Sequence, residues 1–334
     1  MVRFGILGAG NIAHRFAASL SHEPRAELVA ASCRSMQKAE AFLADVPHAA
    51  GARAYSNHDD LLADPAVDAI YLALPHDLHH AWAIAALRAG KAVLCEKPAT
   101  LTAANMQDIA HVATQTGTCF MEAMKPRFVA IYQPVMDAVA QLGHIRYVEA
   151  TLCNDMLGFV EGSGSYHMTP GPGAGVLLDC GTYCASWIAA LCAGEPELLS
   201  CESVLRNGID VYVNARMMFG PIEATLECAF DRAKPRQAVI IGERGRVVVD
   251  DLHRPQHATI ELVDKEPREL VVPYVVDDFF GEVTHFVSLI EDGATRPGTA
   301  LESPVMSLDD SVRCAHILDV VRSGFNGTGS AATA

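Results

Sequence analysis

Positive charge is scarce in this sequence, which has 25 lysine and arginine residues against 40 aspartates and glutamates and a formal net charge of −15. No stretch of the chain gathers basic residues into a run. Binding to the phosphate backbone of a nucleic acid, or to an anionic membrane surface, requires clustered Lys and Arg side chains. The charge balance therefore argues against both kinds of partner.

Long uncharged hydrophobic segments are also missing, because no such run reaches the roughly 18 to 20 residues of a membrane-spanning helix. The first apolar segment begins at residue 2, so we expect no signal peptide ahead of it. The ten cysteines are scattered, and no second Cys or His pair accompanies Cys180 and Cys184 at zinc-finger spacing. The sequence predicts reduced thiols, no metal site and a cytoplasmic protein.

The 334 residues suffice for two domains, and the pattern of the chain changes after about residue 122. Up to that point short apolar strands alternate with amphipathic helices, which is typical of a doubly wound parallel sheet. We therefore predict an α/β fold that begins with a Rossmann domain over residues 1–122. The expected strands are 2–7, 27–33, 67–74, 91–96 and 117–124, and helices are expected after the first strand and at 36–44, 79–90 and 103–116.

Residues 123–323 predict a second domain of the α+β class. Helices are expected near 130–141, 182–194, 279–291 and 308–322, and strands at 145–153, 197–206, 211–219, 222–230, 237–243, 245–251, 258–264 and 268–274. Alternation within these strands predicts a large, mostly antiparallel, open-faced sheet. We expect an exposed apolar face of this sheet to be buried in a homodimer or higher homo-oligomer, and residues 324–334 to form a disordered tail.

The sequence GAGNIA at 8–13 follows the first predicted strand and opens a helix. Gly8 permits a tight turn, Gly10 lets backbone N–H groups approach a pyrophosphate, and Ala13 allows close helix–strand packing. In this β–α–β context the motif predicts a dinucleotide cofactor, and a tight turn without a ligand is the alternative. The predicted contacts of the turn are Gly8, Gly10, Asn11 and Ile12.

The second strand ends without the carboxylate that would bond the ribose 2′-hydroxyl of NAD. It reads Ser32-Cys33-Arg34-Ser35, with Lys38 one helical turn further on. Arg34 can stack on adenine or pair with a 2′-phosphate, and the hydroxyls and Lys38 are further donors. We therefore predict NADP as the cofactor, with NAD as the alternative, while a solvated loop arginine is the alternative role for Arg34.

Segments spread along the chain resemble the Gfo/Idh/MocA family of NAD(P)-dependent sugar and polyol dehydrogenases. They are GAGNIA at 8–13, YLALPHDLHH at 71–80, AGKAVLCEKP at 89–98 and GVLLDCGTYCASW at 175–187. FMEAMKPRF at 120–128 is similar to the branch of dimeric dihydrodiol dehydrogenases, NADP-linked D-xylose dehydrogenases and glucose–fructose oxidoreductase. The resemblance covers the chain apart from its tail and implies a dehydrogenase that acts on CH–OH groups of a small carbohydrate, polyol or diol.

The resemblance also implies roles for single residues. Lys97 is implied to be catalytic beside the nicotinamide, Tyr183 to be the acid/base, and Asp179 to be the carboxylate that precedes it. The remaining expected cofactor contacts are Leu74, Pro75, His76, His79, Glu96 and Glu122. Candidates for substrate binding, beside Asp179, are Arg127, Tyr166 and His167. Relatives commonly carry an Arg in the loop where this chain has Tyr166-His167-Met168, so the substrate itself does not transfer.

Oxidation of an alcohol needs a base for the hydroxyl proton, and free tyrosine has a pKa near ~10. A nearby ammonium lowers that pKa, which gives Lys97 a purpose. Because Asp179 and Tyr183 are four residues apart, we expect them to share one helix face. Pro98 should end the strand and aim Lys97 at the ligand-binding edge of the sheet. Alternatives are a packed tyrosine at 183 and a helix cap at 179.

The leading hypothesis is an NADP(H)-dependent enzyme that transfers hydride to or from a sugar, polyol or cyclic trans-diol. Two rivals remain. One is an aldose–aldose oxidoreductase that keeps its cofactor bound, and the other is a non-catalytic NADP-sensing regulator. The presence of both Lys97 and Tyr183 argues against the regulator.

Overall fold

The computed structural model describes residues 1–162, 166–293 and 301–325. Contacts within the chain group it into two compact units. The first contains Met1–Ala130 and Tyr274–Val312, and the second contains Ile131–Pro273 and the chain from Arg313 onward. This grouping differs from the predicted division at residue 122, because residues 274–312 return to the first unit. From residue 326 on, the predicted tail lies outside the described residues.

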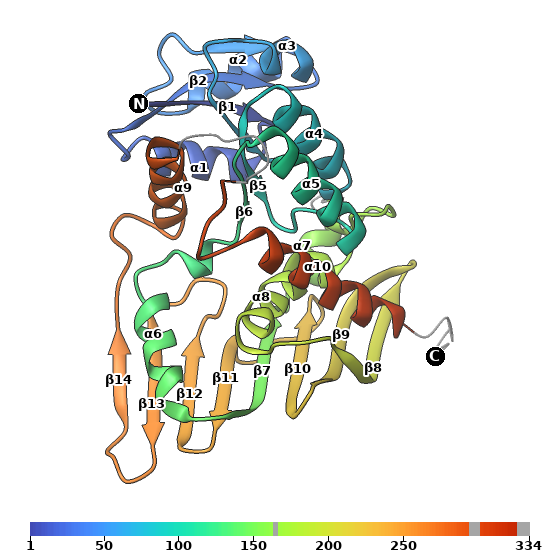
Figure 1. Ribbon diagram of the computed structural model, residues 1–334. Coiled ribbons are helices and arrows are strands. Elements are labelled where there is room, and N and C mark those ends of the chain that lie inside the picture. The colour runs from blue at the N-terminus through green and yellow to red at the C-terminus, as the bar shows by residue number, and fades with distance from the viewer. Residues whose placement is uncertain (163–165, 294–300, 326–334) are drawn as a thin grey trace. The chain divides into compact units, whose positions relative to one another are not determined.

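A six-stranded sheet forms the centre of the first unit, in the order β3-β2-β1-β4-β5-β6 (Figure 1). Every pair of neighbouring strands in it is parallel. The strands are β1 (Val2–Leu7), β2 (Ala26–Ser32), β3 (Arg53–Tyr55), β4 (Ala69–Leu72), β5 (Ala92–Glu96) and β6 (Phe120–Ala123). The strand order reverses between β1 and β4, which is where sheets of this kind bind ligands at their carboxyl ends. The predicted doubly wound Rossmann sheet is confirmed.

Helices connect these strands and bury them. They are α1 (Asn11–Leu20), α2 (Met36–Asp45), α3 (His58–Leu62), α4 (His76–Arg88) and α5 (Ala103–Thr116), followed by a 3₁₀ turn at Lys125–Arg127. All residues of β4 and β5 are buried, as expected for strands covered on both faces. The sequence did not reveal β3 and α3, because elements of 3 and 5 residues are too short to show a periodic pattern.

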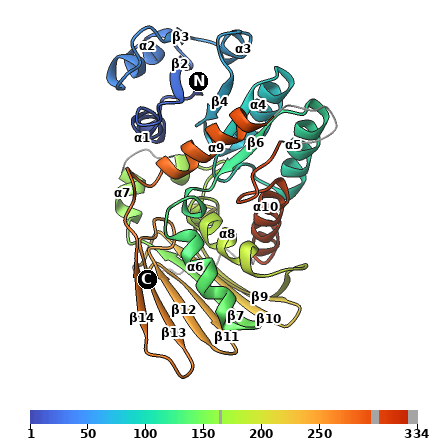
Figure 2. The same cartoon turned by 60° about the vertical axis from the view of Figure 1, so that its left-hand side comes forward.

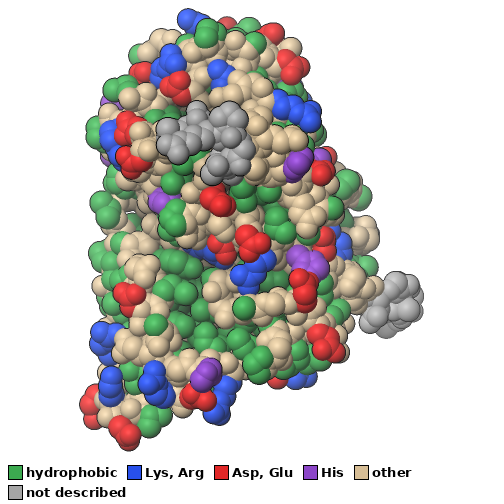
Figure 3. Space-filling model, in the orientation of Figure 1, with side chains coloured by type: hydrophobic (Ala, Val, Ile, Leu, Met, Phe, Trp, Pro, Cys, Tyr) green, Lys and Arg blue, Asp and Glu red, His purple; other side chains and the backbone are tan. Residues whose placement is uncertain are grey.

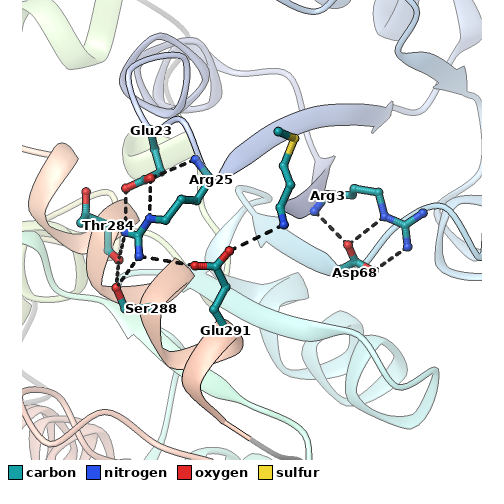
Figure 4. A network of polar contacts seen from close by, with 8 residues as sticks. Arg3, Glu23, Arg25, Asp68, Thr284, Ser288 and Glu291 are labelled. Atoms are coloured by element: carbon teal, nitrogen blue, oxygen red, sulfur yellow. Dashed lines mark hydrogen bonds and ion pairs between the residues drawn. The ribbon is translucent and has the colours of Figure 1, made fainter.

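Helix α9 (Phe280–Asp292) comes from a late part of the chain but contacts α1 and β1 of the first unit. Its buried side chains join the core cluster around Phe4. Figure 4 shows a polar seam beside it, in which Arg25 donates to Glu23 at 2.9 Å and pairs with Glu291 of α9 at 3.4 Å. Apolar and ionic contacts together explain why this helix belongs to the first unit.

The second unit is built on an eight-stranded sheet in the order β14-β13-β12-β11-β7-β10-β9-β8. Its strands are β7 (Ile145–Cys153), β8 (Glu197–Arg206), β9 (Ile209–Phe219), β10 (Ile222–Ala229), β11 (Gln237–Gly242), β12 (Gly245–Asp250), β13 (His257–Leu262) and β14 (Arg268–Val271). Only β7 and β10 pair in parallel, and the other neighbours are antiparallel. The predicted mostly antiparallel sheet is confirmed.

Two helices of the second unit pack on the same side of its sheet, α6 (Tyr132–Val139) on β12 and α8 (Thr182–Leu191) on β7 and β10 (Figure 2). The remaining helical elements are a 3₁₀ turn at Ala140–Leu142, α7 (Leu157–Gly162), a 3₁₀ turn at Tyr166–Met168, a π turn at Leu177–Gly181 and α10 (Leu308–Ser323), whose residues are divided between the units. The short turns in the Gly-, Pro- and Ser-rich segment before α8 were not predicted.

The face of this sheet away from α8 carries many polar side chains. Arg216 pairs with Glu223 at 2.6 Å across β9 and β10, and Arg246 pairs with Glu261 at 2.8 Å across β12 and β13. Hydrophobic side chains such as Ile241, which is 37% exposed, lie between them. The exposed apolar face that we expected is therefore interrupted by ion pairs.

The charged residues of the molecule are mixed rather than segregated on the face shown in Figure 3, where Lys and Arg side chains stand among Asp and Glu. This agrees with the dispersed basic residues of the sequence. Within the described ranges, no helix combines the length and the apolar character needed to cross a bilayer.

Candidate active site

The turn after β1 offers an open helix end to a phosphate. Gly8 has φ +100, and a Cβ there would lie 2.5 Å from the carbonyl oxygen of Ala73, so the position requires glycine. A Cβ at Gly10 would meet no atom within 4 Å. Helix α1 begins at Asn11, which leaves the backbone N–H groups of its first turn, including that of Ile12, without helical partners. This cradle fits a pyrophosphate group.

The end of β2 separates the predicted donors into two groups. Ser32 is fully buried and its hydroxyl contacts Nδ1 of His58, so it is directed to the interior. Arg34 and Lys38 are exposed. The hydroxyl of Ser35 accepts the backbone N–H of Lys38 at 3.4 Å and caps helix α2. The exposed side chains of Arg34 and Lys38 therefore remain as possible phosphate contacts at the end of β2, while Ser35 caps α2.

The loop from Leu74 to His79 is held by a buried imidazole. Helix α4 begins at His76, directly after Pro75. The two ring nitrogens of His79 lie 2.7 Å from the carbonyl oxygen of Leu74 and 2.9 Å from that of Pro98. Burial lowers the pKa of His79, and a neutral ring donates through one nitrogen at a time. His79 thus joins the loop to the turn after β5, which suits a shaping role.

Buried carboxylates on both sides fix the backbone around Lys97. Glu96 accepts the hydroxyl of Tyr71 through one oxygen and the backbone N–H of Lys97, at 3.2 Å, through the other. Burial raises the pKa of Glu96, while the Tyr71 hydrogen bond and the Lys97 charge oppose the rise. On β6, Oε1 of Glu122 accepts the backbone N–H of Ala99 at 2.9 Å. Lys97 therefore leaves the carboxyl end of β5 from a doubly anchored segment.

Arg127, a predicted substrate contact, lies inside the first unit. It is 5% exposed. Its guanidinium donates to the carbonyl oxygen of Val305 at 3.1 Å and pairs with Asp310 at 3.2 Å. The neighbouring Lys125 is likewise buried and paired with Asp278. These contacts favour a structural role for Arg127 over the predicted one.

Within the second unit, the structure brings Tyr166, His167 and Asp179 together, and Tyr183 follows in the next helix. Tyr183 lies in the first turn of α8 and is 8% exposed. Asp179 lies in the π turn just before it, and its Oδ1 is 3.9 Å from Nε2 of His167. The ring of Tyr166 lies 4.0 Å from that of His167, centroid to centroid. A phenol, a carboxylate and an imidazole thus come from one continuous stretch of chain.

His253 was not predicted, although its ring centroid is 5.8 Å from that of Tyr183. It lies in the turn after β12, which is held against α8 because Nε1 of Trp187 donates to the carbonyl oxygen of Leu252 at 2.9 Å. A single histidine in a Leu-His-Arg-Pro loop carries no periodic or spacing signal. Only the fold could reveal this residue.

We had expected Asp179 and Tyr183 to share one face of a regular α-helix. The structure instead places Asp179 in a π turn and Tyr183 in α8. The π turn Leu177–Gly181 precedes α8, and neither element has a side-chain hydrogen bond from its own capping residue. Asp179 is inside the turn, so it does not cap a helix end. π turns are rare and are frequently found at functional sites.

The cysteines do not contribute reactive groups to this region. All ten are free thiols, and nine are buried. Burial raises the pKa of Cys153 to about 12 and places that of Cys184 well above its ordinary value, which suppresses the thiolate. In the part of the chain that the structure describes, no three His, Cys, Asp or Glu side chains converge to hold a metal ion.

Comparison with known proteins identifies the family of the chain. Residues 2–124 match an oxidoreductase family with an NAD-binding Rossmann fold, and residues 136–248 match the Gfo/Idh/MocA C-terminal domain. Similar proteins include scyllo-inositol 2-dehydrogenase (NADP(+)) of Bacillus subtilis, 28% identical over 96% of each chain, and trans-1,2-dihydrobenzene-1,2-diol dehydrogenase of Bos taurus, 30% identical over 98% of each.

Among solved structures, a 3-ketoreductase from Actinomadura kijaniata in complex with NADP and TDP-benzene is 25% identical to the chain. It superimposes with a TM-score of 0.82 over 97% of both chains. Both domains, the glycine turn and the Glu-Lys-Pro segment thus agree with one assignment. The chain belongs to the Gfo/Idh/MocA oxidoreductase family.

Proposed function

We propose that the protein is an NADP(H)-dependent dehydrogenase that transfers hydride between the nicotinamide and a hydroxyl or carbonyl carbon of a sugar, polyol or cyclic trans-diol. The observation that carries the proposal is the anchoring of Lys97. At the carboxyl end of β5, the buried Glu96 accepts the backbone N–H of Lys97, and the buried Glu122 accepts the backbone N–H of Ala99. The first turn of the same sheet fits a pyrophosphate. A surface lysine would need no such support.

The preference for NADP rests on the end of β2. Arg34 and Lys38 are exposed there, and the strand end offers no carboxylate to a ribose 2′-hydroxyl. A guanidinium pairs well with a phosphate in a charge-assisted, bidentate contact. The name of the Bacillus subtilis relative specifies NADP(+), and the ketoreductase was crystallised with NADP, which supports the same preference here.

Proton transfer is assigned to Tyr183. In oxidation the substrate O–H bond breaks and its proton passes to the phenolate oxygen of Tyr183, while the C–H bond breaks and its electron pair leaves with the hydride, so that a carbonyl forms. The nicotinamide, when bound, supplies the hydride acceptor or donor. In reduction Tyr183 returns the proton to the new alkoxide. We assign to the Lys97 ammonium the role of favouring the phenolate form of Tyr183.

Asp179, His167 and Tyr166 form the proposed substrate-binding group. A carboxylate accepts hydrogen bonds from substrate hydroxyls, and an imidazole can donate or accept them. The Tyr166 ring offers an apolar surface to the C–H face of a sugar or ring diol. A polyhydroxylated substrate uses all three, which is why we prefer that class over simple alcohols.

A homodimer or larger homo-oligomer through the second sheet, and a cytoplasmic location, stay predictions from the sequence. The ion pairs among the apolar side chains of that sheet face are compatible with a self-complementary interface.

The test is absorbance at 340 nm with NADP⁺ and separately with NAD⁺, against aldoses, inositols and trans-dihydrodiols. We expect turnover that prefers NADP⁺, with coenzyme that is lost on dilution. Coenzyme retained through gel filtration, with turnover only when two aldoses are supplied, would indicate the aldose–aldose oxidoreductase. Tight NADPH binding with no turnover in either direction would indicate the sensor.

A further inference from the structure

The π turn before Tyr183 is capped by a carboxylate from a distant strand. Asp210 lies near the start of β9, and its Oδ2 accepts the backbone N–H of Leu177 at 2.7 Å, across 33 residues of sequence. Burial raises the pKa of Asp210, and the hydrogen bond from the Leu177 backbone opposes that rise. Unpaired N–H groups at a helical start favour a negative charge. Asp210 therefore supplies the cap that the segment does not provide from its own sequence.

Gly175 completes this contact. Its φ is +102, and a Cβ would lie only 2.0 Å from Oδ1 of Asp210. Its own N–H donates to the carbonyl oxygen of His167 at 2.9 Å. The same turn thus holds the carboxylate on one side and the His167 backbone on the other.

The capped turn leads directly to Asp179, a proposed substrate contact, and to Tyr183, the proposed acid/base. The N–H of Asp179 donates to the carbonyl oxygen of Gly175 at 3.4 Å, and α8 with Tyr183 follows the π turn without a break. A π turn holds one more residue per hydrogen-bonded ring than an α-helix. The hydrogen-bond register of the π turn therefore depends on how residues 175–177 are held. A shift of these residues would rotate the side chains of Asp179 and Tyr183.

We propose that Asp210 is a positioning residue that sets the placement of Asp179 for substrate binding and of Tyr183 for proton transfer. It is assigned no contact with the reacting atoms and acts through the backbone of residues 175–177. The proposal rests on the proposed function of Tyr183. It adds a residue on β9 that determines the site geometry and lies outside segments 8–13 and 175–187, on which the family resemblance rests.

The test compares Asp210→Ala, Asp210→Asn, Gly175→Ala and the double variant Asp210→Ala/Gly175→Ala. Glu223→Gln serves as the control, since it removes a half-buried carboxylate of the neighbouring strand that pairs with Arg216 on the other face of the sheet. We expect kcat to fall about 10- to 100-fold in Asp210→Ala, the scale of a misplaced catalytic group. Asp210→Asn should lose less, because one acceptor oxygen remains. The substrate KM should rise as well, because Asp179 belongs to the proposed substrate-binding group, whereas the NADPH Kd should change less than about threefold.

Gly175→Ala should reproduce the loss, and the double variant should lose about as much as either single variant, because both act on one turn. Hydrogen exchange at the Val176 and Leu177 amides gives a readout without turnover, and we expect faster exchange in Asp210→Ala. Unchanged exchange, or an unchanged kcat and pH profile with only a lower Tm, would overturn the proposal. If the wild type turns over no substrate, the proposed function fails instead, and exchange still decides whether Asp210 holds the turn.

Discussion

Around Lys97, the supporting groups are buried side chains on the same or the adjacent strand, Glu96 on β5 and Glu122 on β6. Around Tyr183, support comes from remote segments. Asp210 caps the preceding turn, and Trp187 fixes the loop of His253 through Leu252. The segment around Lys97 therefore depends on strand order, whereas the segment around Tyr183 depends on a few long-range polar contacts.

The largest effect expected on coenzyme binding concerns the glycine turn. Gly10→Ala should raise the NADPH Kd about a hundredfold, or about 2.8 kcal/mol, because its Cβ would occupy the space of the pyrophosphate. The Tm should stay the same, since that space is otherwise open. Gly8→Ala should weaken binding and also lower the Tm, because it strains the backbone against Ala73. Fluorescence titration and thermal melting measure both quantities.

Gly158→Ala is the matched control, because a Cβ there also meets no atom within 4 Å. It should leave the NADPH Kd and the Tm unchanged. Normal NADPH binding by Gly10→Ala would show that the pyrophosphate does not use this turn.

A smaller effect should distinguish the coenzymes. Arg34→Ala should weaken NADPH binding about tenfold through the lost charge-assisted contact, and it should leave NADH binding unchanged. Arg88→Ala, which removes another exposed arginine, controls for net charge. Calorimetric titration with both coenzymes measures the ratio. Equal losses for NADPH and NADH would assign Arg34 to adenine stacking instead.

A last effect, on stability and not on binding, concerns Glu282 of α9. It is fully buried, and neither carboxylate oxygen has a hydrogen-bond partner among the described residues. Burial, with the charge of Glu96 adding to it, raises its pKa well above the ordinary value, and Lys125 opposes the rise. A raised folded-state pKa means that the folded protein binds more protons than the unfolded chain. Stability should therefore fall as the pH rises above about 4.3, the ordinary carboxyl value.

Glu282→Leu should remove this penalty and raise the free energy of unfolding by about 1–3 kcal/mol near neutral pH. The difference from the wild type should shrink as the pH is lowered. Glu122→Leu should have the opposite sign, because the Ala99 N–H would lose its acceptor. Urea unfolding between pH 5 and 8 measures both variants. Wild-type and Glu282→Leu stabilities that run parallel across this range would contradict a buried carboxyl with a raised pKa.

Where local signals suffice, the sequence predicted element boundaries to the residue. Helix α5 begins after Thr102, whose hydroxyl accepts the Asn105 N–H, and ends at Gly117, with φ 65; both are standard capping residues. Strand β7 shows the alternation of a one-sided sheet. The glycine turn and Glu-Lys-Pro were also visible, because their neighbours in sequence are their neighbours in space.

The rest of the site could not be read in this way. The π turn is capped by Asp210, which is 33 residues away from Leu177 in sequence. The loop that carries His253 is held near Tyr183 by the hydrogen bond between Trp187 and Leu252, which are 65 residues apart. The interior contact of Ser32 likewise comes from His58, 26 residues later. Contacts of this range leave no periodic pattern in the chain, so only the folded arrangement shows them.

The proposed hydride transfer depends most directly on Tyr183 as the acid/base and on Lys97 as its partner. The decisive measurement is the rate of NADPH formation at 340 nm by wild type, Tyr183→Phe and Lys97→Met, on the substrate that the panel identifies. Tyr132→Phe controls for the loss of a hydroxyl in the same unit. Tyr183→Phe and Lys97→Met should each lose about 10²- to 10⁴-fold in kcat while they bind NADPH normally. A Tyr183→Phe enzyme that turns over within about twofold of the wild type would contradict it.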